Sequence, residues 1–309
     1  MSIPTITTPA TNLDARAAWS ILTEPADHIA GALTDALGHA DALTAVTSGA
    51  LADALPNHDP RDVADAQKRW NGRLPSLTRL VDDALTRAAQ HGITLIDPSQ
   101  IPGLADLGTG KPHALWIKGD TTALNNPLTT KIALIGARAS TGYGDNITAQ
   151  LAHDIAAAGL TTISGGAYGI DGAAHRAALA TGGATIAFTA GGADRAYPAG
   201  HSDLFGRIAT ADRSALISEV APGATPTKWR FLTRARLIAA ASAATVVVEA
   251  GSRSGSLNTA SHANALNRGL GAVPGPITSA ASSGCHRLLR DYQATAITSG
   301  AEAIELLNT

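Results

Sequence analysis

The sequence of 309 residues has a single cysteine, Cys285, which excludes an internal disulfide and any zinc or iron–sulfur site that needs several thiolates. Any transition-metal site would therefore depend on the ten histidines. Long apolar runs are also missing, since none approaches the roughly 18 residues needed to cross a bilayer. Residues 1–5 lack the basic region and apolar stretch of a secretory signal. We expect a cytoplasmic protein without a membrane partner.

Aromatic and charged residues are scarce, at 4% and 16%, whereas hydrophobic residues make up 45%. This composition is too apolar for a disordered chain. The length suggests about two domains of roughly 150 residues each. We therefore expect a globular protein with a substantial core.

The net charge of −2, taken over the whole chain, gives no sign of a nucleic-acid partner, but the charge is unevenly placed. Residues 1–130 hold 9 Lys and Arg against 14 Asp and Glu, whereas residues 131–309 hold 14 against 11. No acid lies between Glu219 and Glu249. Phosphates respond to local charge, which favours a nucleic-acid partner for this part of the chain. The segment combines cations with large aromatics within nine residues: Lys228, Trp229, Arg230, Phe231, Arg234 and Arg236.

Three regions follow one another along the chain. Residues 1–92 have Ala and Leu at helical spacing, which predicts a small helical domain. Residues 93–130 combine short apolar stretches with Pro and Gly, which predicts a linker with a leading strand. In residues 131–309, short apolar runs alternate with helical segments. This alternation predicts an α/β, Rossmann-like, mostly parallel sheet flanked by helices.

The strands and helices of the third region can be placed individually. Right-handed crossovers would bring the loops at the carboxyl ends of all its strands to one rim of the sheet. The expected strands are Ile132–Ile135, Thr161–Ile163, Ala184–Phe188, Ala215–Ser218, Thr245–Val248 and Gly271–Val273. The expected helices are Asn146–Ala158, Asp171–Ala180, Ser202–Thr210, Leu232–Ser242 and Leu257–Asn267.

Three of these strands run directly into loops of small residues, at 136–140, 164–171 and 249–256. Glycine allows close backbone approach, and the helix that follows each loop offers free N–H groups to an anion. The three loops together predict phosphate binding, although any one of them could be a tight structural turn. Neither the dinucleotide fingerprint nor a Walker motif is present, so we expect no NAD or ATP cofactor.

The segment Ser164-Gly165-Gly166-Ala167-Tyr168-Gly169-Ile170-Asp171-Gly172-Ala173-Ala174-His175 resembles the signature of the DNA processing protein A family, also called DprA or Smf. Further motifs occur in the family's order, over about residues 114–290. The resemblance implies a Rossmann-like domain that binds single-stranded DNA without catalysis and without a cofactor. It also implies a homodimer that hands the strand to the RecA recombinase during natural transformation. The further motifs are Trp116–Asp120, Gly136–Arg138, Gly191–Pro198, Ser218-Glu219, Arg234–Ala239, Gly255–Ala260 and Val273–Gly275.

The resemblance and the local chemistry point to the same candidate residues. Arg138 and Lys228 would contact phosphates, while Phe231 or Trp229 would stack on a base. Phe231 could instead be a hydrophobic staple at the start of the helix that follows it. Arg234 and Arg236 lie about 200° apart on an ideal helix, so at least one is expected to be a structural ion-pair residue. The candidate DNA-binding residues are Arg138, Ser164, Gly165, Gly166, Tyr168, Lys228, Phe231, Arg234, Arg236, Gly255 and Ser256.

The sequence departs from the family pattern in three ways. The common Arg-Asn-Arg is Arg234-Ala235-Arg236 here. The chain stops soon after Leu306-Leu307, so we expect no C-terminal winged-helix domain. Residues 1–90 resemble the family's N-terminal domain only in size and helical character.

Five other residues suggest catalysis or metal binding, and each also has a structural explanation. Asp171 and His175 could be a metal pair, but an Asp cap on a helix above a packed His is favoured. Glu249 could be the general base of a nucleotide phosphoribohydrolase or sensor, which is the alternative function. It could equally orient Arg138 or a backbone N–H. Ser164 and Ser256 lack a nucleophile elbow and are expected to be capping hydroxyls.

Overall fold

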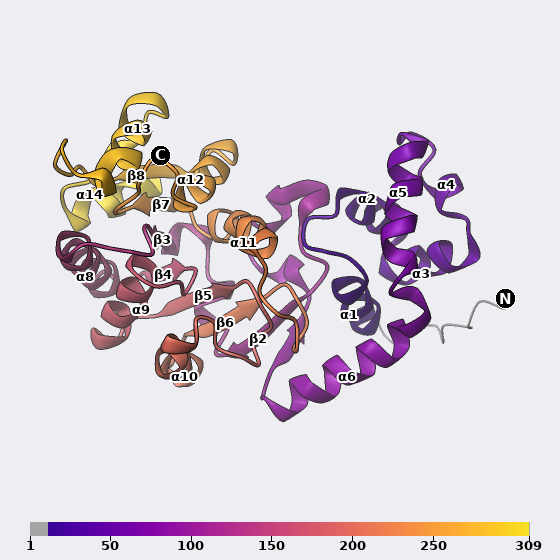
Figure 1. Cartoon of the computed structure of the whole chain (residues 1–309). Helices are drawn as coiled ribbons and strands as arrows, with labels where there is room; N and C mark the ends of the chain where they lie inside the picture. Colours follow the sequence, from indigo (N-terminus) through magenta and orange to yellow (C-terminus); the bar gives the residue numbers. More distant parts are fainter. Residues whose placement is uncertain (1–11, 309) are drawn as a thin grey trace.

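The computed structural model describes residues 12–308, which form a helical part and a larger part built on one sheet (Figure 1). Residues 1–5, on which the expectation about a secretory signal rests, lie outside the described residues. Among residues 12–308, no helix is both long and apolar enough to cross a membrane.

Residues 12–90 are helical, as their Ala and Leu spacing predicts. Trp19 and Trp70 pack edge to face in the core of this helical domain, with ring centroids 5.5 Å apart. Leu33, Leu43 and other aliphatic side chains surround them. The helices are α1 (Asn12–Leu22), α2 (His28–Leu37), α3 (His39–Ser48), α4 (Leu51–Ala54), α5 (Pro60–Asn71) and α6 (Leu77–Gln90).

One sheet holds the nine strands found in the described residues, in the order β1-β2-β6-β5-β4-β3-β7-β8-β9. The strands from β6 to β9 run parallel to their neighbours, which confirms the predicted fold class. The segment 93–130 adds β1 and β2 antiparallel at the edge formed by β6. The strands are β1 (Thr94–Ile96), β2 (Leu115–Gly119), β3 (Lys131–Ile135), β4 (Thr161–Ser164), β5 (Thr185–Thr189), β6 (Ala215–Ser218), β7 (Ala244–Val247), β8 (Gly269–Ala272) and β9 (Thr295–Ala296).

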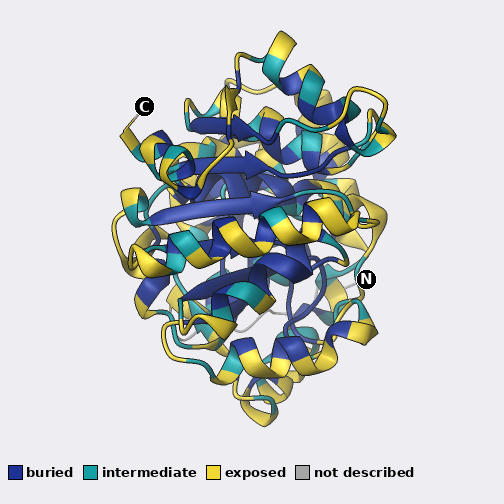
Figure 2. Cartoon of the chain, turned by 90° about the vertical axis from the view of Figure 1, so that its left-hand side faces the viewer, coloured by how far each residue is buried: buried dark blue, intermediate teal, exposed yellow. Residues whose placement is uncertain are grey.

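Helices cover both faces of this sheet, so the strands β3 to β8 are buried while each helix keeps an exposed side (Figure 2). Alternate residues of β3 point to opposite faces: Ile132 and Leu134 pack against α8, α9 and α14, whereas Ala133 and Ile135 pack against α11, α12 and α13. The helices of this sheet domain are α7 (Thr122–Asn125), α8 (Gly142–Ala157), α9 (Ile170–Ala180), α10 (Ser202–Thr210), α11 (Lys228–Ala240), α12 (Ser256–Ala265), α13 (Ser283–Asp291) and α14 (Gly300–Glu305).

Two helices begin about one turn earlier than their apolar residues predict. Thr141 accepts the N–H of Gly144 at 3.2 Å and starts α8 at Gly142 instead of Asn146. Thr227 accepts the N–H of Arg230 at 3.2 Å and starts α11 at Lys228 instead of Leu232. The capping hydroxyls thus place Lys228 and Phe231 on a helix.

The direction of the chain across the sheet reverses at β3. From β3 the chain builds β4, β5 and β6 on one side, and it then returns to build β7, β8 and β9 on the other. Ile135 is paired with Val247, so the carboxyl ends of β3 and β7 lie side by side. Sheets of this type bind ligands at such a switch point, because the loops on its two sides diverge there.

Candidate nucleic-acid interface

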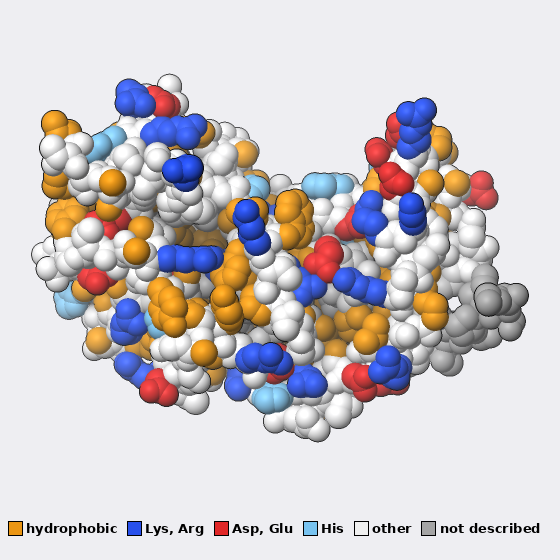
Figure 3. Space-filling model, in the orientation of Figure 1, with side chains coloured by type: hydrophobic (Ala, Val, Ile, Leu, Met, Phe, Trp, Pro, Cys, Tyr) orange, Lys and Arg blue, Asp and Glu red, His pale blue; other side chains and the backbone are white. Residues whose placement is uncertain are grey.

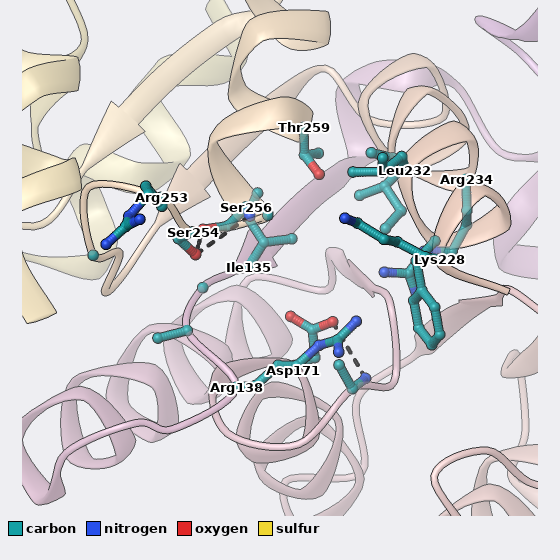
Figure 4. A pocket seen from close by; sticks show the side chains of 18 of the residues that line it. Ile135, Arg138, Asp171, Lys228, Leu232, Arg234, Arg253, Ser254, Ser256 and Thr259 are labelled. Carbon is teal, nitrogen blue, oxygen red and sulfur yellow. Dashed lines mark hydrogen bonds between the residues drawn. The ribbon is translucent and has the colours of Figure 1, made fainter. Parts of the chain in front are cut away.

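A pocket of about 900 Å³ opens at the switch point. Its walls come from the loop after β3, the loop after β7 and the amino-terminal halves of α11 and α12 (Figure 4). Figure 3 shows this face of the sheet domain hollowed, with Lys and Arg side chains around the hollow. The pocket therefore combines segments that are far apart in the sequence.

The loop after β3 is held by backbone contacts, and it leaves Arg138 exposed. The N–H of Ala137 donates to the Glu249 carbonyl at 2.7 Å, and the Ala137 carbonyl accepts the N–H of Ile170 at 3.1 Å. A Cβ on Gly136 would lie 2.5 Å from the Ile170 side chain, so glycine is required for this close approach. Arg138 is thereby presented to the pocket on a fixed backbone.

Glu249 is buried and serves a structural purpose. Its two carboxylate oxygens accept the N–H of Thr141 at 2.8 Å and the Thr141 hydroxyl at 2.6 Å. Glu249 thus holds the residue that caps α8, in line with the expectation that it orients a backbone N–H at the rim. Both oxygens are already engaged, which leaves a general-base role without support.

The start of the signature loop after β4 is buried, and three of the predicted contact residues lie outside the pocket. Ser164 is fully buried and donates to the Leu134 carbonyl at 2.6 Å. Gly165 and Gly166 are also buried, and neither lines the pocket. Gly166 has φ +69°, and a Cβ there would lie 2.6 Å from the Phe205 ring. These residues make the tight turn that the alternative explanation describes, and Ala167 lies at the pocket instead.

Tyr168 is exposed, but it lies outside the pocket. Its ring meets His201 edge to face, with centroids 4.8 Å apart. The side chain turns toward His201 and is absent from the pocket walls, so the structure does not bring Tyr168 together with the other predicted contact residues at the pocket.

Asp171 and His175 do not form a metal site. Asp171 follows the cap residue Gly169 and accepts the N–H of Ala167 at 3.3 Å, so it braces the loop and does not cap α9. Burial raises the pKa of Asp171, and the nearby Arg234 guanidinium opposes that shift. His175 is buried against Thr185, as expected. Within residues 12–308, no three His, Cys, Asp or Glu side chains are placed to hold a metal ion.

The start of α11 supplies a cation and an aromatic ring to the pocket. Lys228 is exposed and points into it (Figure 4). The ring of Phe231 also lines the pocket, and the Arg138 guanidinium lies 4.6 Å from its centroid. Trp229, 59% exposed, is not part of the wall. Of the two aromatic candidates for stacking, Phe231 is therefore the one at the site.

Arg234 and Arg236 differ in role, as their opposite directions on the helix predict. Arg234 lines the pocket and donates from Nη1 to the carbonyls of Gly165 and Phe188, the latter at 3.0 Å. It thereby holds α11 against the ends of β4 and β5, and burial lowers its pKa.

Arg236, also a predicted DNA contact, is buried outside the pocket. Its Nη1 and Nη2 atoms lie 2.8 and 2.5 Å from the two carboxylate oxygens of Glu219. Its Nε donates to the Gly110 carbonyl at 3.0 Å. Because the whole guanidinium is engaged, Arg236 is the structural ion-pair residue of the two.

The loop after β7 forms the opposite wall. The predicted residues Gly255 and Ser256 line it, together with Arg253, Ser254 and Thr259, which the sequence prediction missed. The hydroxyls of Ser254 and Ser256 are 2.8 Å apart. Arg253 is exposed and stands across the pocket from Lys228 (Figure 4). Its position in a Gly- and Ser-rich loop after a buried strand was the signal that could have identified it.

Three cations of the pocket have no acidic partner. Among residues 12–308, no carboxylate oxygen lies within 4.0 Å of a side-chain nitrogen of Arg138, Lys228 or Arg253. By contrast, Arg230 pairs with Glu24 and Arg236 with Glu219. The pocket therefore concentrates uncompensated positive charge beside hydroxyls and an aromatic ring. Such a surface suits a phosphate chain that carries bases.

Residues 92–308 match the family described as DNA recombination-mediator protein A. The chain belongs to this family. It is 41% identical to the putative DNA processing protein DprA of Mycobacterium tuberculosis, over 94% of this chain and 74% of that protein. Membership of the DNA recombination-mediator protein A family agrees with the resemblance carried by the signature loop.

Two solved structures of the family resemble this one. The DNA processing protein A of Streptococcus pneumoniae superposes with a TM-score of 0.72 at 28% identity, covering 96% of this chain and 97% of that one. This coverage includes most of the helical domain. The protein from Helicobacter pylori, described for its single-stranded DNA binding mode, gives a TM-score of 0.63 at 31% identity, covering 70% of this chain and 95% of that one.

Proposed function

We propose that the protein binds single-stranded DNA in the switch-point pocket and acts as a recombination mediator without catalysing a reaction. The observation that carries the proposal is the convergence of Arg138, Lys228 and Arg253, all without acidic partners, around Phe231. Family membership and the single-stranded DNA binding described for the relative from Helicobacter pylori support it.

The shape and charge of the pocket favour a single strand over a duplex. Cations on two opposing walls would flank a phosphate chain, with Lys228 and Phe231 on α11 and Arg253 on the loop after β7. Phe231 would stack on one base, which contributes roughly 1–3 kcal/mol and tolerates any base. Sequence preference should be slight. A narrow pocket gives no broad basic face for a duplex, so single strands should bind much better than double strands.

The proposal is tested by measuring the affinity for a labelled oligothymidine at salt concentrations from about 50 to 200 mM. Lys228→Ala should weaken binding and reduce the salt slope by about one phosphate contact. Arg207→Ala, which removes an exposed cation from α10 outside the pocket, should leave both unchanged. An unaltered slope in Lys228→Ala would remove Lys228 from the site.

The same preparation distinguishes the proposal from a nucleotide sensor or hydrolase. Mononucleotides and the oligonucleotide are compared by calorimetry, and single- and double-stranded DNA by gel shift. Tight binding of a mononucleotide with no binding of the oligonucleotide would overturn the recombination role.

We further propose a homodimer that passes the strand to a RecA recombinase in the cytoplasm, during DNA uptake and natural transformation; membership of a family of recombination mediators supports the recombination role. Light scattering of the purified protein tests the dimer. Filament assembly by RecA on DNA coated with single-strand binding protein, with and without this protein, tests the loading step. Failure to accelerate assembly would limit the role to DNA binding.

A further inference from the structure

The amino end of α11, which carries Lys228 and Phe231, is held from the helical domain. Arg230 lies between these two residues on the helix and points away from the pocket. Its Nε and Nη2 atoms each donate to Glu24, both at 2.9 Å, in a bidentate pair. Glu24 follows α1 in the chain, so this contact joins the two parts of the molecule.

Arg230 also fixes the loop that leads into α11. Its Nη1 donates to the Thr225 carbonyl at 2.9 Å, two residues before the cap Thr227. The neighbouring residues Lys228 and Trp229 are exposed. One guanidinium therefore ties the loop and the first turn of the helix to a single carboxylate.

The Glu24 carboxylate is held in place by Arg73. Arg73 donates to it at 2.6 Å and, from Nη1, to the carbonyls of Ile21 and Leu22 at the end of α1 and of Thr23 just after it, between 3.1 and 3.3 Å. These contacts satisfy carbonyl groups at the helix end and fix the carboxylate relative to α1. The position of Arg230 is thus set by the helical domain.

We propose that Glu24 is a positioning residue for the DNA-binding pocket: through Arg230 it holds the start of α11 so that Lys228 and Phe231 face the strand. The inference rests on the proposed function and assigns the helical domain a part in it. The pair is partly buried, since the Glu24 side chain is 41% exposed and that of Arg230 only 14%. The two arginine contacts fix the carboxylate in place, and through Arg230 they fix the start of α11.

Charge alone predicts the opposite effect, which makes the inference testable. Removing a carboxylate near a phosphate-binding pocket should strengthen DNA binding if only long-range electrostatics act. If Glu24 positions α11, its removal should weaken binding, because Lys228 and Phe231 lose their fixed placement. A gain in DNA affinity would indicate long-range electrostatics, whereas a loss would indicate that Glu24 positions α11.

The experiment measures oligothymidine affinity and its salt slope for the full chain. Glu24→Ala should weaken binding by about three- to tenfold, within the range for residues that act on a site through packed contacts. Glu24→Gln has the same charge as Glu24→Ala but keeps an oxygen that can accept from Arg230, so it should bind more tightly than Glu24→Ala. Asp83→Ala removes an exposed carboxylate that pairs with Arg79 within α6, and it should not weaken binding.

A double-mutant cycle tests whether Glu24 acts on DNA binding through Lys228. Adding Glu24→Ala to Lys228→Ala should cost less than Glu24→Ala costs alone, because the positioned contact is already gone. Arg230→Lys keeps the charge and loses the bidentate contact, so it should also weaken binding, and it serves as the second variant if Glu24→Ala does not fold.

Equal or tighter binding by Glu24→Ala, or unchanged binding by Arg230→Lys, would overturn the inference. So would fully additive effects in the cycle. If the unaltered protein fails to bind the oligonucleotide, the proposed function itself has failed. If Lys228→Ala binds as tightly as the unaltered protein, Lys228 is not part of the site.

Discussion

At the scale of single residues, Phe231 gives the clearest test of the proposed base stacking in the pocket. Its ring lies against the Arg138 guanidinium at 4.6 Å and the Tyr197 ring at 5.6 Å. Phe231→Ala should weaken oligothymidine binding by roughly 1–3 kcal/mol, while Phe231→Trp should retain it, because stacking needs a ring of any kind. Fluorescence anisotropy measures both. Equal losses in the two variants would indicate that Phe231 only packs the helix.

His175 predicts a pH dependence of folding. It is fully buried, and burial lowers its pKa from 6.5 to about 3. Thr185 donates to the Thr162 carbonyl, so His175 Nδ1–H donates to the Thr185 hydroxyl. A second proton would go to Nε2, a buried atom without a partner among residues 12–308.

Because the unfolded chain binds that proton near pH 6.5, stability from His175 is present above pH 6.5 and is lost progressively as the pH falls toward 3. The loss is about 1.4 kcal/mol per pH unit in this window. Urea unfolding between pH 7 and 5 should show a shallower pH slope for His175→Gln than for the unaltered protein, with the exposed His58→Gln as control. The same slope in all three proteins would contradict the assignment.

Which predicted site residues lie at the pocket depends on their burial. Arg138 and Lys228 follow glycine or capping positions at the rim, and their charge keeps them in solvent, so both line the pocket as the sequence predicts. Ser164 and Gly166 carry the same small-residue pattern as a phosphate loop, yet their contacts with Leu134 and Phe205 depend on packing between distant segments. No local signal in the sequence distinguishes the two cases.

At the scale of elements, three cations of α11 have three different roles. Lys228 faces the pocket, Arg234 holds the helix against two strand ends, and Arg236 is paired inside the protein. Angular position on the helix, together with the elements packed around it, decides between binding and structure.

Arg236→Met should therefore lower the free energy of unfolding by about 3–5 kcal/mol, since it leaves Glu219 unpaired where its side chain is only 11% exposed. Denaturant titration measures the loss. Adding Glu219→Gln should restore part of it. Under native conditions, the salt slope of DNA binding by Arg236→Met should equal that of the unaltered protein. A slope reduced by one phosphate contact would indicate that Arg236 contacts the DNA.

The strands were predicted better than the boundaries of the helices. Continuous apolar runs such as those of β6 and β7 must be buried on both faces, and this fixes their location within a residue. The first turns of α8 and α11 have few apolar residues, so their starts depend on the hydroxyls of Thr141 and Thr227. The antiparallel joining of β1 and β2 could not be predicted, because strand pairing at an edge leaves no pattern in the segment itself.

At the scale of the whole molecule, the uneven charge along the sequence becomes an uneven distribution in space. The carboxylates Glu24 and Glu219 neutralise cations that have structural roles. The cations of the pocket are left uncompensated. A chain of net charge −2 can therefore present a local site for a polyanion.

The switch point also has a consequence for the order of events during synthesis. β3 and Arg138 are made early, but β7, which pairs with the free edge of β3, is made more than a hundred residues later, and Arg253 follows it. A ribosome-bound chain that has emerged only through β6 has one wall of the pocket and an open sheet edge. The pocket is therefore complete only after β7 and the loop that follows it have been translated and β7 has paired with β3.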